Sequence, residues 1–245
     1  MSRADKYLVD HGHFETRAKA QEAIAAGLVS ADGQIIRKPS QKIADGAAIT
    51  AQAAHPYVSR AALKLVAALD VFGIDPAGCT GLDVGSSTGG FTEVLLERGA
   101  ARVYAVDVGR DQLHARLRGD ARVVSMEAQD ARTLSEADFE TAPDFIVCDA
   151  SFISLLKIIP TPLQLAAPGA VFIGLIKPQF EVGRDYIGKG GLVKPEAEGL
   201  RAVERVAAAL DGMAGFNTLG APVKSPVKGG DGNQEYLIAA RKMRD

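Results

Sequence analysis

The segment that decides the fold is Leu82-Asp83-Val84-Gly85-Ser86-Ser87-Thr88-Gly89-Gly90-Phe91. It begins as an apolar strand, passes through a loop with three glycines, and continues into the helical pattern of Phe91–Arg98. Glycine has no Cβ and adopts positive φ easily, so such a loop lets a small molecule approach the bare backbone. Open α/β sheets bind their ligands at the carboxyl ends of parallel strands. The segment therefore predicts a ligand site at the end of such a strand.

The polar residues of this loop favour a cationic ligand over a phosphate. The G-x-G-x-x-G spacing is missing, no Gly-Lys-Ser/Thr sequence closes the loop, and Asp83 would repel a phosphate. A carboxylate beside the glycines suits a cofactor with an amino-acid head and a sulfonium, and S-adenosylmethionine fits best. The residues expected to bind it here are Asp83, Gly85, Ser87, Thr88, Gly89, Gly90 and Phe91. Taken alone, the motif also fits an ordinary Gly-rich turn between a strand and a helix.

Two further acids follow at later strand ends. Apolar Val103–Val106 ends in Asp107, about 20 residues after the glycines, where an acidic residue takes ribose hydroxyls in such folds. The next expected strand, Arg122–Ser125, is followed by Asp130. A lone aspartate in a loop is usually just solvated, but three acids at successive strand ends share one rim of the sheet. We interpret this rim as a nucleoside site and expect Asp107 and Asp130 to bind the cofactor.

Strand and helix patterns alternate along the rest of the chain. Phe145–Cys148 and Val171–Ile176 are expected strands, Ala197–Leu210 is an amphipathic helix, and Tyr236–Ala240 is the last strand. This alternation predicts an α/β fold with a doubly wound, mainly parallel sheet. We expect three parts: a small α+β domain over residues 1–50, a linker over 51–58, and the α/β domain over 59–245.

Composition is consistent with this organisation. The chain has 245 residues and a net charge of -2, which does not by itself suggest nucleic acid, although residues 1–60 carry +2 and the remainder -4. Cys79 and Cys148 lie in apolar runs without metal-ligand spacing, so we expect buried thiols in a reducing compartment and no metal site. No signal peptide or membrane span is visible. These features predict a soluble cytoplasmic protein.

The first sixty residues carry a pattern of their own. Two short helical patterns are followed by a hairpin around Asp32-Gly33, and Thr16 can cap the second helix. The order Arg3-x-Asp5-Lys6-x-Leu8, Arg17-x-x-Ala20 and Ile24-x-x-Gly27-x-Val29-x-x-x-Gly33 resembles the alpha-L RNA-binding motif. The resemblance implies docking onto RNA by shape. The side chains expected to contact RNA here are Arg3, Lys6, Arg17 and Lys19.

Four charged residues are expected near the rim that carries the glycine loop: Lys64, Asp149, Lys177 and Glu235. Asp149 and Lys177 follow strands, Glu235 precedes the last strand, and Lys64 lies on a helix expected over Arg60–Val71. Each could be an ordinary surface charge or half of one salt bridge. As a set, they are a way to hold and activate a hydroxyl group.

Five motifs in order closely resemble the TlyA family: Ser59-Arg60-x-x-x-Lys64-Leu65, Asp83-x-Gly85-x-Ser87-x-Gly89-Gly90-Phe91, Val147-Cys148-Asp149-x-Ser151-Phe152, Lys177-Pro178-Gln179-Phe180-Glu181 and Ser225-Pro226-x-x-Gly229-x-x-Gly232-Asn233-x-Glu235-Tyr236. Proteins of this family join an alpha-L motif to an FtsJ-like methyltransferase and have also been called hemolysins. The resemblance spans nearly the whole chain. It implies a seven-stranded Rossmann-like methyltransferase sheet.

The same resemblance implies an activity: transfer of a methyl group from S-adenosylmethionine to a cytidine ribose 2′-hydroxyl in ribosomal RNA of the small subunit, the large subunit or both. The family's Lys-Asp-Lys-Glu tetrad maps onto Lys64, Asp149, Lys177 and Glu235. Lys177 would act as general base or proton relay and Asp149 would orient it, while the other two position the ribose. Further RNA contacts are expected from Arg60, Arg184 and Lys189, the last two in a Gly-rich basic loop that is either a mobile flap or a disordered connection.

Other functions remain open at this point. An FtsJ-type enzyme could methylate a different nucleoside, and a ribosome assembly factor could keep the fold without catalysis. A membrane-lytic protein is disfavoured because no spanning or strongly amphipathic insertion segment is found. The expected partners are ribosomal RNA or ribosomal subunits and not membranes, and the oligomeric state is open.

Overall fold

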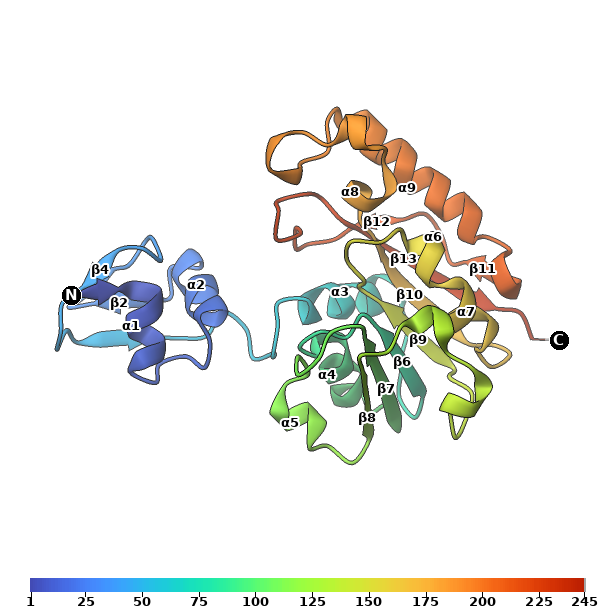
Figure 1. Cartoon of the computed structure of the whole chain (residues 1–245), viewed down its shortest axis with the longest axis horizontal. Helices are drawn as coiled ribbons and strands as arrows, with labels where there is room; N and C mark the ends of the chain where they lie inside the picture. The colour runs from blue at the N-terminus through green and yellow to red at the C-terminus, as the bar shows by residue number, and fades with distance from the viewer. Residues whose placement is uncertain (245) are drawn as a thin grey trace. The chain divides into compact units, whose positions relative to one another are not determined.

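The computed structural model describes residues 1–244 and divides the chain into two compact units, Met1–Tyr57 and a second unit that begins at Val58 (Figure 1). Ala51, which the sequence places in a linker, is the last residue of a strand and pairs with Val29. The first unit therefore extends beyond residue 50. The unit has its own hydrophobic core, formed by side chains that include Leu8, Ile24 and Ile43.

The elements of the first unit are β1 (Ser2–Arg3), α1 (Ala4–Asp10), α2 (Arg17–Ala25), β2 (Val29–Ala31), β3 (Gln34–Ile35), β4 (Lys42–Ile43) and β5 (Ile49–Ala51). The predicted helix cap is confirmed, because the Thr16 hydroxyl oxygen accepts the Lys19 backbone N–H at 3.3 Å. The predicted hairpin is confirmed as well. Asp32 and Gly33 both adopt positive φ between β2 and β3, as a tight two-residue turn requires.

The second unit is built on one sheet of eight strands: β6 (Thr80–Val84), β7 (Arg102–Asp107), β8 (Val123–Glu127), β9 (Phe145–Cys148), β10 (Val171–Ile176), β11 (Phe216–Thr218), β12 (Val223–Lys224) and β13 (Tyr236–Lys242). Seven of them follow the order β11-β13-β10-β9-β6-β7-β8, and β12 pairs beside β13. The five strands from β10 to β8 are parallel, whereas β13 runs antiparallel to its neighbours. The predicted mainly parallel α/β sheet is confirmed.

Helices cover both faces of this sheet, as can be followed in Figure 1. They are α3 (Ala62–Phe72), α4 (Gly90–Glu97), α5 (Ala115–Arg118), α6 (Leu155–Ile158), α7 (Pro160–Gln164), α8 (Pro178–Glu181) and α9 (Glu196–Leu210). One core joins α6, α7 and α9 to alternate strand residues such as Leu82, Ile146 and Phe172. The opposite face meets α4, where Leu95 packs over Gly81. Both faces are buried, which explains the continuous apolar character of the central strands.

The direction of each strand determines which residues meet at one edge. β6, β7, β9 and β10 all end at the carboxyl edge of the sheet, and β13 begins there because it is antiparallel. Asp149 and Lys177 leave this edge, while Glu235 immediately precedes the strand that enters from it. The reversal of β13 is therefore what brings Glu235 to the ends of the parallel strands.

Candidate active site

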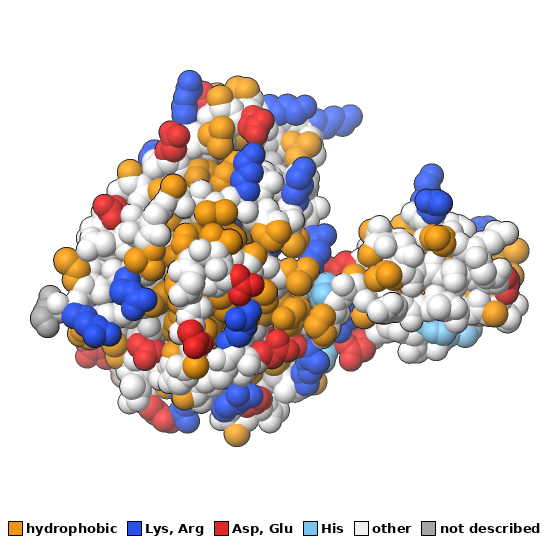
Figure 2. Space-filling model, turned by 180° about the vertical axis from the view of Figure 1, so that it is seen from behind, with side chains coloured by type: hydrophobic (Ala, Val, Ile, Leu, Met, Phe, Trp, Pro, Cys, Tyr) orange, Lys and Arg blue, Asp and Glu red, His pale blue; other side chains and the backbone are white. Residues whose placement is uncertain are grey.

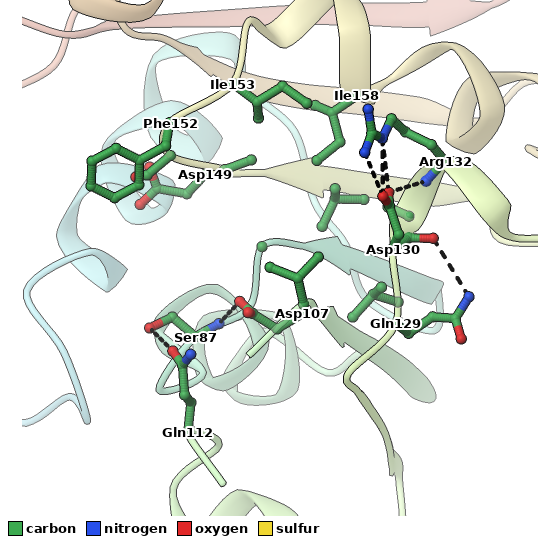
Figure 3. Close-up of a pocket in the computed structure, with 17 residues that line it drawn as sticks. Ser87, Asp107, Gln112, Gln129, Asp130, Arg132, Asp149, Phe152, Ile153 and Ile158 are labelled. Carbon is green, nitrogen blue, oxygen red and sulfur yellow. Dashed lines mark hydrogen bonds and ion pairs between the residues drawn. The ribbon is translucent and has the colours of Figure 1, made fainter. Parts of the chain in front are cut away.

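A cavity of about 430 Å³ opens at this carboxyl edge. Its walls come from the loops after β6, β7, β8 and β9, and residues from 84 to 158 line it. Figure 3 shows Asp149 and Phe152 on one side of the cavity, Asp130 and Arg132 on another, and Asp107 with Ser87 facing them. The volume and the mixture of apolar walls with a few polar groups are those of a small-molecule site.

Asp107 organises the glycine loop. Its Oδ2 accepts the backbone N–H of Ser87 at 2.8 Å, and its Oδ1 accepts the N–H of Gly109 at 2.7 Å. The Ser87 hydroxyl donates in turn to Gln112 at 3.1 Å. A carboxylate has about four lone-pair sites, so Asp107 keeps acceptor capacity while it is held in place. It lines the cavity and can accept hydroxyl groups of a ligand.

Asp130 lies across the cavity from the glycine loop. Arg132 binds it through two guanidinium nitrogens, with Nη2 at 2.6 Å from Oδ2 and Nε at 3.0 Å from Oδ1. The Arg132 guanidinium holds the pKa of Asp130 below its usual range. Arg132 and the neighbouring Gln129, which the sequence analysis did not single out, also line this side of the cavity. The cavity wall therefore offers hydrogen-bonding groups of Gln129 and Arg132 in addition to the Asp130 carboxylate.

Asp83 does not line the cavity, so the geometry does not favour the direct contact with the cofactor that the sequence predicts. The side chain is fully buried, and one oxygen accepts both the N–H and the hydroxyl of Thr92 at 2.9 and 2.7 Å. Burial raises the pKa of Asp83 to about 7. The residue fixes the start of α4 against the end of β6, and thereby the glycine loop between them.

Replacing Asp83 with asparagine should change how stability depends on pH. A buried acid with a raised pKa holds its proton in the folded state between about pH 4 and pH 7, where the unfolded chain has lost it, so stability falls as pH rises through this window. The amide of the variant cannot titrate. Thermal unfolding followed across this pH window should show wild type losing stability relative to Asp83→Asn. Parallel curves for the two proteins would contradict the assignment.

The glycine loop divides into residues that face the cavity and residues that face the protein. Gly85 and Ser87 line the cavity. Gly85 has φ +80°, and a Cβ there would lie 2.9 Å from the Ala150 Cα, so close packing against the loop after β9 requires glycine. The remaining predicted cofactor residues, which do not line the cavity, are Thr88, Gly89, Gly90 and Phe91. Phe91 is a core residue, because it is only 1% exposed.

The four predicted catalytic residues lie together at the carboxyl edge. Lys64 Nζ on α3 lies 2.6 Å from Glu235 Oε2 and 3.4 Å from Asp149 Oδ2. Lys177 Nζ lies 2.8 Å from the other oxygen of Asp149. Asp149 thus bridges two lysines, and the cluster of two cations and two anions is neutral overall. Its members are mostly buried, and Asp149 is the one that lines the cavity.

Lys177 has two further partners. Its Nζ also lies 3.0 Å from the Asp149 backbone oxygen and 2.8 Å from the Ser151 hydroxyl. These two oxygens accept two of the three N–H bonds of an ammonium group, and the Asp149 carboxylate is its ion-pair partner. Ser151 is exposed and lines the cavity, so the contact with Ser151 is the one that a hydroxyl group entering from the cavity can replace.

Phe152 is an aromatic residue at the site that the sequence motif contained but to which no role was assigned. It is 91% exposed, adopts a positive φ of 65°, lines the cavity beside Asp149, and touches Phe180 with ring centroids 5.4 Å apart. A large aromatic side chain held in solvent by an unfavourable backbone conformation is typical of a functional site. Its position directly after the strand-end polar residues, outside any apolar period, was the available signal.

The predicted RNA-contacting residues differ in their freedom to bind. Lys6, Arg60, Arg184 and Lys189 are exposed. Lys19 is half-buried, and its Nζ lies 2.9 Å from Glu15. Arg3 and Arg17 are both engaged with Asp5, at 3.0 and 2.7 Å. The positive charges of Arg3 and Arg17 are therefore partly neutralised by a carboxylate of the same unit.

The basic loop after α8 has local structure of its own in the described chain. It contains the short 3-10 turns Arg184–Tyr186 and Lys189–Gly191, and Ile187 forms a bridge with Val193. Buried Asn233 holds it, because its amide accepts the Val193 N–H at 3.0 Å and donates to the Gly191 oxygen at 2.8 Å. Figure 2 shows basic side chains projecting from the end of the larger unit that carries this loop.

Residues 57–242 match the model of the FtsJ-like methyltransferase family, and residues 2–49 match the S4 domain. A 16S/23S rRNA (cytidine-2′-O)-methyltransferase TlyA of Mycobacterium tuberculosis is 42% identical over 246 residues, covering 100% of this chain and 91% of the relative. The chain belongs to the TlyA family of FtsJ-like methyltransferases. The family assignment explains why the glycine loop and the four charged residues occur together.

Two further similar proteins show how far the similarity extends. A 23S rRNA (cytidine-2′-O)-methyltransferase TlyA of Campylobacter jejuni is 42% identical over 186 residues, which cover 74% of this chain and 69% of the relative. A solved structure of a candidate hemolysin from Streptococcus thermophilus has a TM-score of 0.78 and 42% identity, covering 98% of this chain and 88% of the other. The likeness therefore includes both the S4 unit and the methyltransferase unit.

Two classes of feature are missing from the part of the chain that the structure describes. Among residues 1–244, no helix is long and apolar enough to cross a membrane. Within the same residues, His, Cys, Asp and Glu side chains form no group of three that could hold a metal ion.

Proposed function

We propose that this TlyA family member methylates the ribose 2′-hydroxyl of a cytidine in ribosomal RNA, with S-adenosylmethionine as methyl donor. The observation that carries the proposal is the cluster of Lys64, Asp149, Lys177 and Glu235, which adjoins the cavity at the carboxyl edge of the sheet. A buried, balanced set of two lysines and two acids next to a nucleoside-sized cavity can orient a hydroxyl group and receive its proton.

The residues around the cavity fit S-adenosylmethionine. Asp107 keeps free acceptor sites for the ribose hydroxyls, and Gln129, Asp130 and Arg132 offer polar groups on the opposite side. Asp149 places a carboxylate on the wall where a cationic centre would be stabilised. We propose that these residues and the backbone around Gly85 hold the cofactor, while Asp83 acts from below by fixing the loop.

The chemical step needs little beyond orientation and removal of a proton. When bound, S-adenosylmethionine supplies a methyl group already activated by its sulfonium. After the Lys177 ammonium has released one proton to solvent, its amine would accept the proton of the ribose 2′-hydroxyl, with the hydroxyl in place of the Ser151 contact. Asp149 holds the resulting ammonium, and the Lys64–Glu235 pair fixes Asp149 from the other side. A base in this role contributes about 10²–10⁴-fold in rate.

Phe152 is placed to hold the target base. A nucleotide in a duplex must leave its stack before its ribose can enter a cavity, and an exposed aromatic ring next to the reacting group offers a surface for the displaced base. Stacking of a base on an aromatic side chain is worth about 1–3 kcal/mol. We therefore propose that Phe152 stacks on the target cytidine.

Replacing Phe152 with leucine should lower kcat/KM for ribosomal substrates about tenfold or more, with S-adenosylmethionine binding unchanged, because leucine keeps the apolar bulk but has no aromatic face. Phe152→Tyr should restore most of the rate. Single-turnover methylation, with cofactor affinity measured by calorimetry, separates the two effects. Equal rates for the leucine and tyrosine variants would refute the stacking role.

The relatives differ in the RNA that their names give, since one is a 16S/23S enzyme and the other a 23S enzyme. The large subunit is common to both, so we expect it to be a substrate here. Labelled methyl transfer to separated small subunits, large subunits and protein-free rRNA tests the proposal. Incorporation into large subunits is expected. Failure to label any of the three substrates while S-adenosylmethionine binds would point to an assembly factor instead.

A further inference from the structure

Asp5 is a fully buried carboxylate in the small RNA-binding unit. It lies in the first turn of α1, and its side chain is 0% exposed. Ionised side chains are almost never fully buried unless they are paired, because removing a charge from water is costly. The partners of Asp5 therefore show why it is buried.

Those partners are mainly two arginines from different elements. Arg3 Nε donates to Asp5 Oδ1 at 3.0 Å and Nη2 to Oδ2 at 3.1 Å, which is a side-on fork. Arg17 Nη2 on α2 donates to Oδ2 at 2.7 Å, and Gln21 adds an amide donor at 2.8 Å. The bond from Arg3 holds the pKa of Asp5 well below its usual range. The carboxylate is thus charged and saturated with donors.

The two guanidinium groups remain accessible although they are anchored. The Arg3 and Arg17 side chains are 51% and 56% exposed. A guanidinium has five N–H donors, and each of these two uses Nε and Nη2 on Asp5, so donors remain on both for another ligand. Arginine donors in a planar fork match the oxygens of a phosphate group.

We infer that Asp5 is a positioning residue of the RNA interface, which fixes Arg3 and Arg17 as a preformed fork for RNA backbone phosphates. A free arginine loses rotamer freedom when it binds, and anchoring it beforehand removes that loss from the binding step. The inference rests on the proposed function, since it assumes that this unit binds rRNA. The alternative is that RNA affinity depends only on the net charge of the unit. In that account the negative charge of Asp5 weakens RNA binding, because it cancels the charge of one arginine.

The two accounts predict opposite effects for Asp5→Asn. The substitution removes one negative charge and so raises the net charge of the unit by one, and charge counting therefore predicts tighter RNA binding with a steeper salt dependence. Positioning predicts weaker binding, because asparagine cannot hold two guanidinium groups. Asp10→Asn is the matched control: it makes the same charge change on the same helix, and Asp10 is exposed and makes no ion pair within residues 1–244.

The test is binding of the full-length variants to isolated large ribosomal subunits over a range of salt concentrations. We expect Asp10→Asn to bind at least as tightly as wild type and Asp5→Asn to bind about tenfold more weakly than Asp10→Asn. Circular dichroism and S-adenosylmethionine binding should be unchanged in both. Folded Asp5→Asn that binds as tightly as Asp10→Asn would overturn the inference.

A second variant covers the case in which Asp5→Asn unfolds the small unit. Arg3→Lys combined with Arg17→Lys keeps the charge and lets lysines pair with Asp5, but it removes both forks. If the arginine forks hold RNA phosphates, this double variant should bind large subunits about tenfold more weakly than wild type. Undiminished binding would overturn the inference. The proposed function fails separately, since its failure appears as absence of methyl transfer by the wild-type protein.

Discussion

Lys177→Ala should abolish nearly all methyl transfer while leaving the fold and S-adenosylmethionine binding close to those of wild type. The Lys177 amine contacts Asp149 and Ser151 on the substrate side of the cluster, and it does not line the cavity that we assign to the cofactor. Removing it therefore takes away the proton acceptor without touching Asp107 or Gly85, and Asp149 keeps its ion pair with Lys64. Loss of a positioned base corresponds to a fall of about 10²–10⁴-fold in single-turnover rate.

Lys177→Arg distinguishes a base from a fixed positive charge. Arginine keeps the charge and can still pair with Asp149, but it does not deprotonate at accessible pH and cannot accept the proton. We expect it to be nearly as inactive as the alanine variant. The matched control is Lys157→Arg, at an exposed lysine on α6 outside the cavity, which should be fully active. A Lys177→Arg enzyme with a near wild-type rate would show that the lysine is an electrostatic anchor.

Deleting residues 1–57 should abolish methylation of ribosomal substrates but preserve binding of S-adenosylmethionine. Among residues 1–244, those that line the cavity lie between 84 and 158, so the proposed cofactor site needs no residue of the small unit. The deletion should retain Val58, because its N–H donates to the buried Glu93 carboxylate at 2.6 Å on α4. Calorimetry of the truncated and full-length proteins should give similar cofactor affinities. Full activity of the truncated protein on intact subunits would refute this division of labour.

Much of the fold could be predicted from the sequence because its central strands are strongly apolar. Phe145–Cys148 and Val171–Ile176 have the predicted bounds, and α9 begins one residue before its predicted start. The short helices α6 and α7 were not predicted, because elements of four or five residues carry no clear period and α7 also contains two prolines. Nor could the antiparallel direction of β13 be predicted, since strand direction depends on pairing with distant residues.

The sequence predicted which residues gather at the candidate site, but not which of them are buried. The motif order suggested that Lys64, Asp149, Lys177 and Glu235 lie close together, whereas the burial of Asp83 depends on its bonds to Thr92 on α4. The burial of Asp5, which is part of the alpha-L motif, was not predicted for a similar reason. Asp5 is buried by contacts with Arg17 and Gln21, which are distant in sequence. A sequence pattern shows which residues carry charge, but not whether a partner on another element holds them out of solvent.

The central claim is that the Lys64–Asp149–Lys177–Glu235 cluster directs methyl transfer to a ribose hydroxyl of cytidine. The most direct test is mass spectrometry of nucleosides from large-subunit RNA incubated with the enzyme and labelled S-adenosylmethionine. The account predicts that the label appears in 2′-O-methylcytidine and that Lys177→Ala abolishes it. Label on a base, or on the ribose of another nucleoside, would contradict the claim.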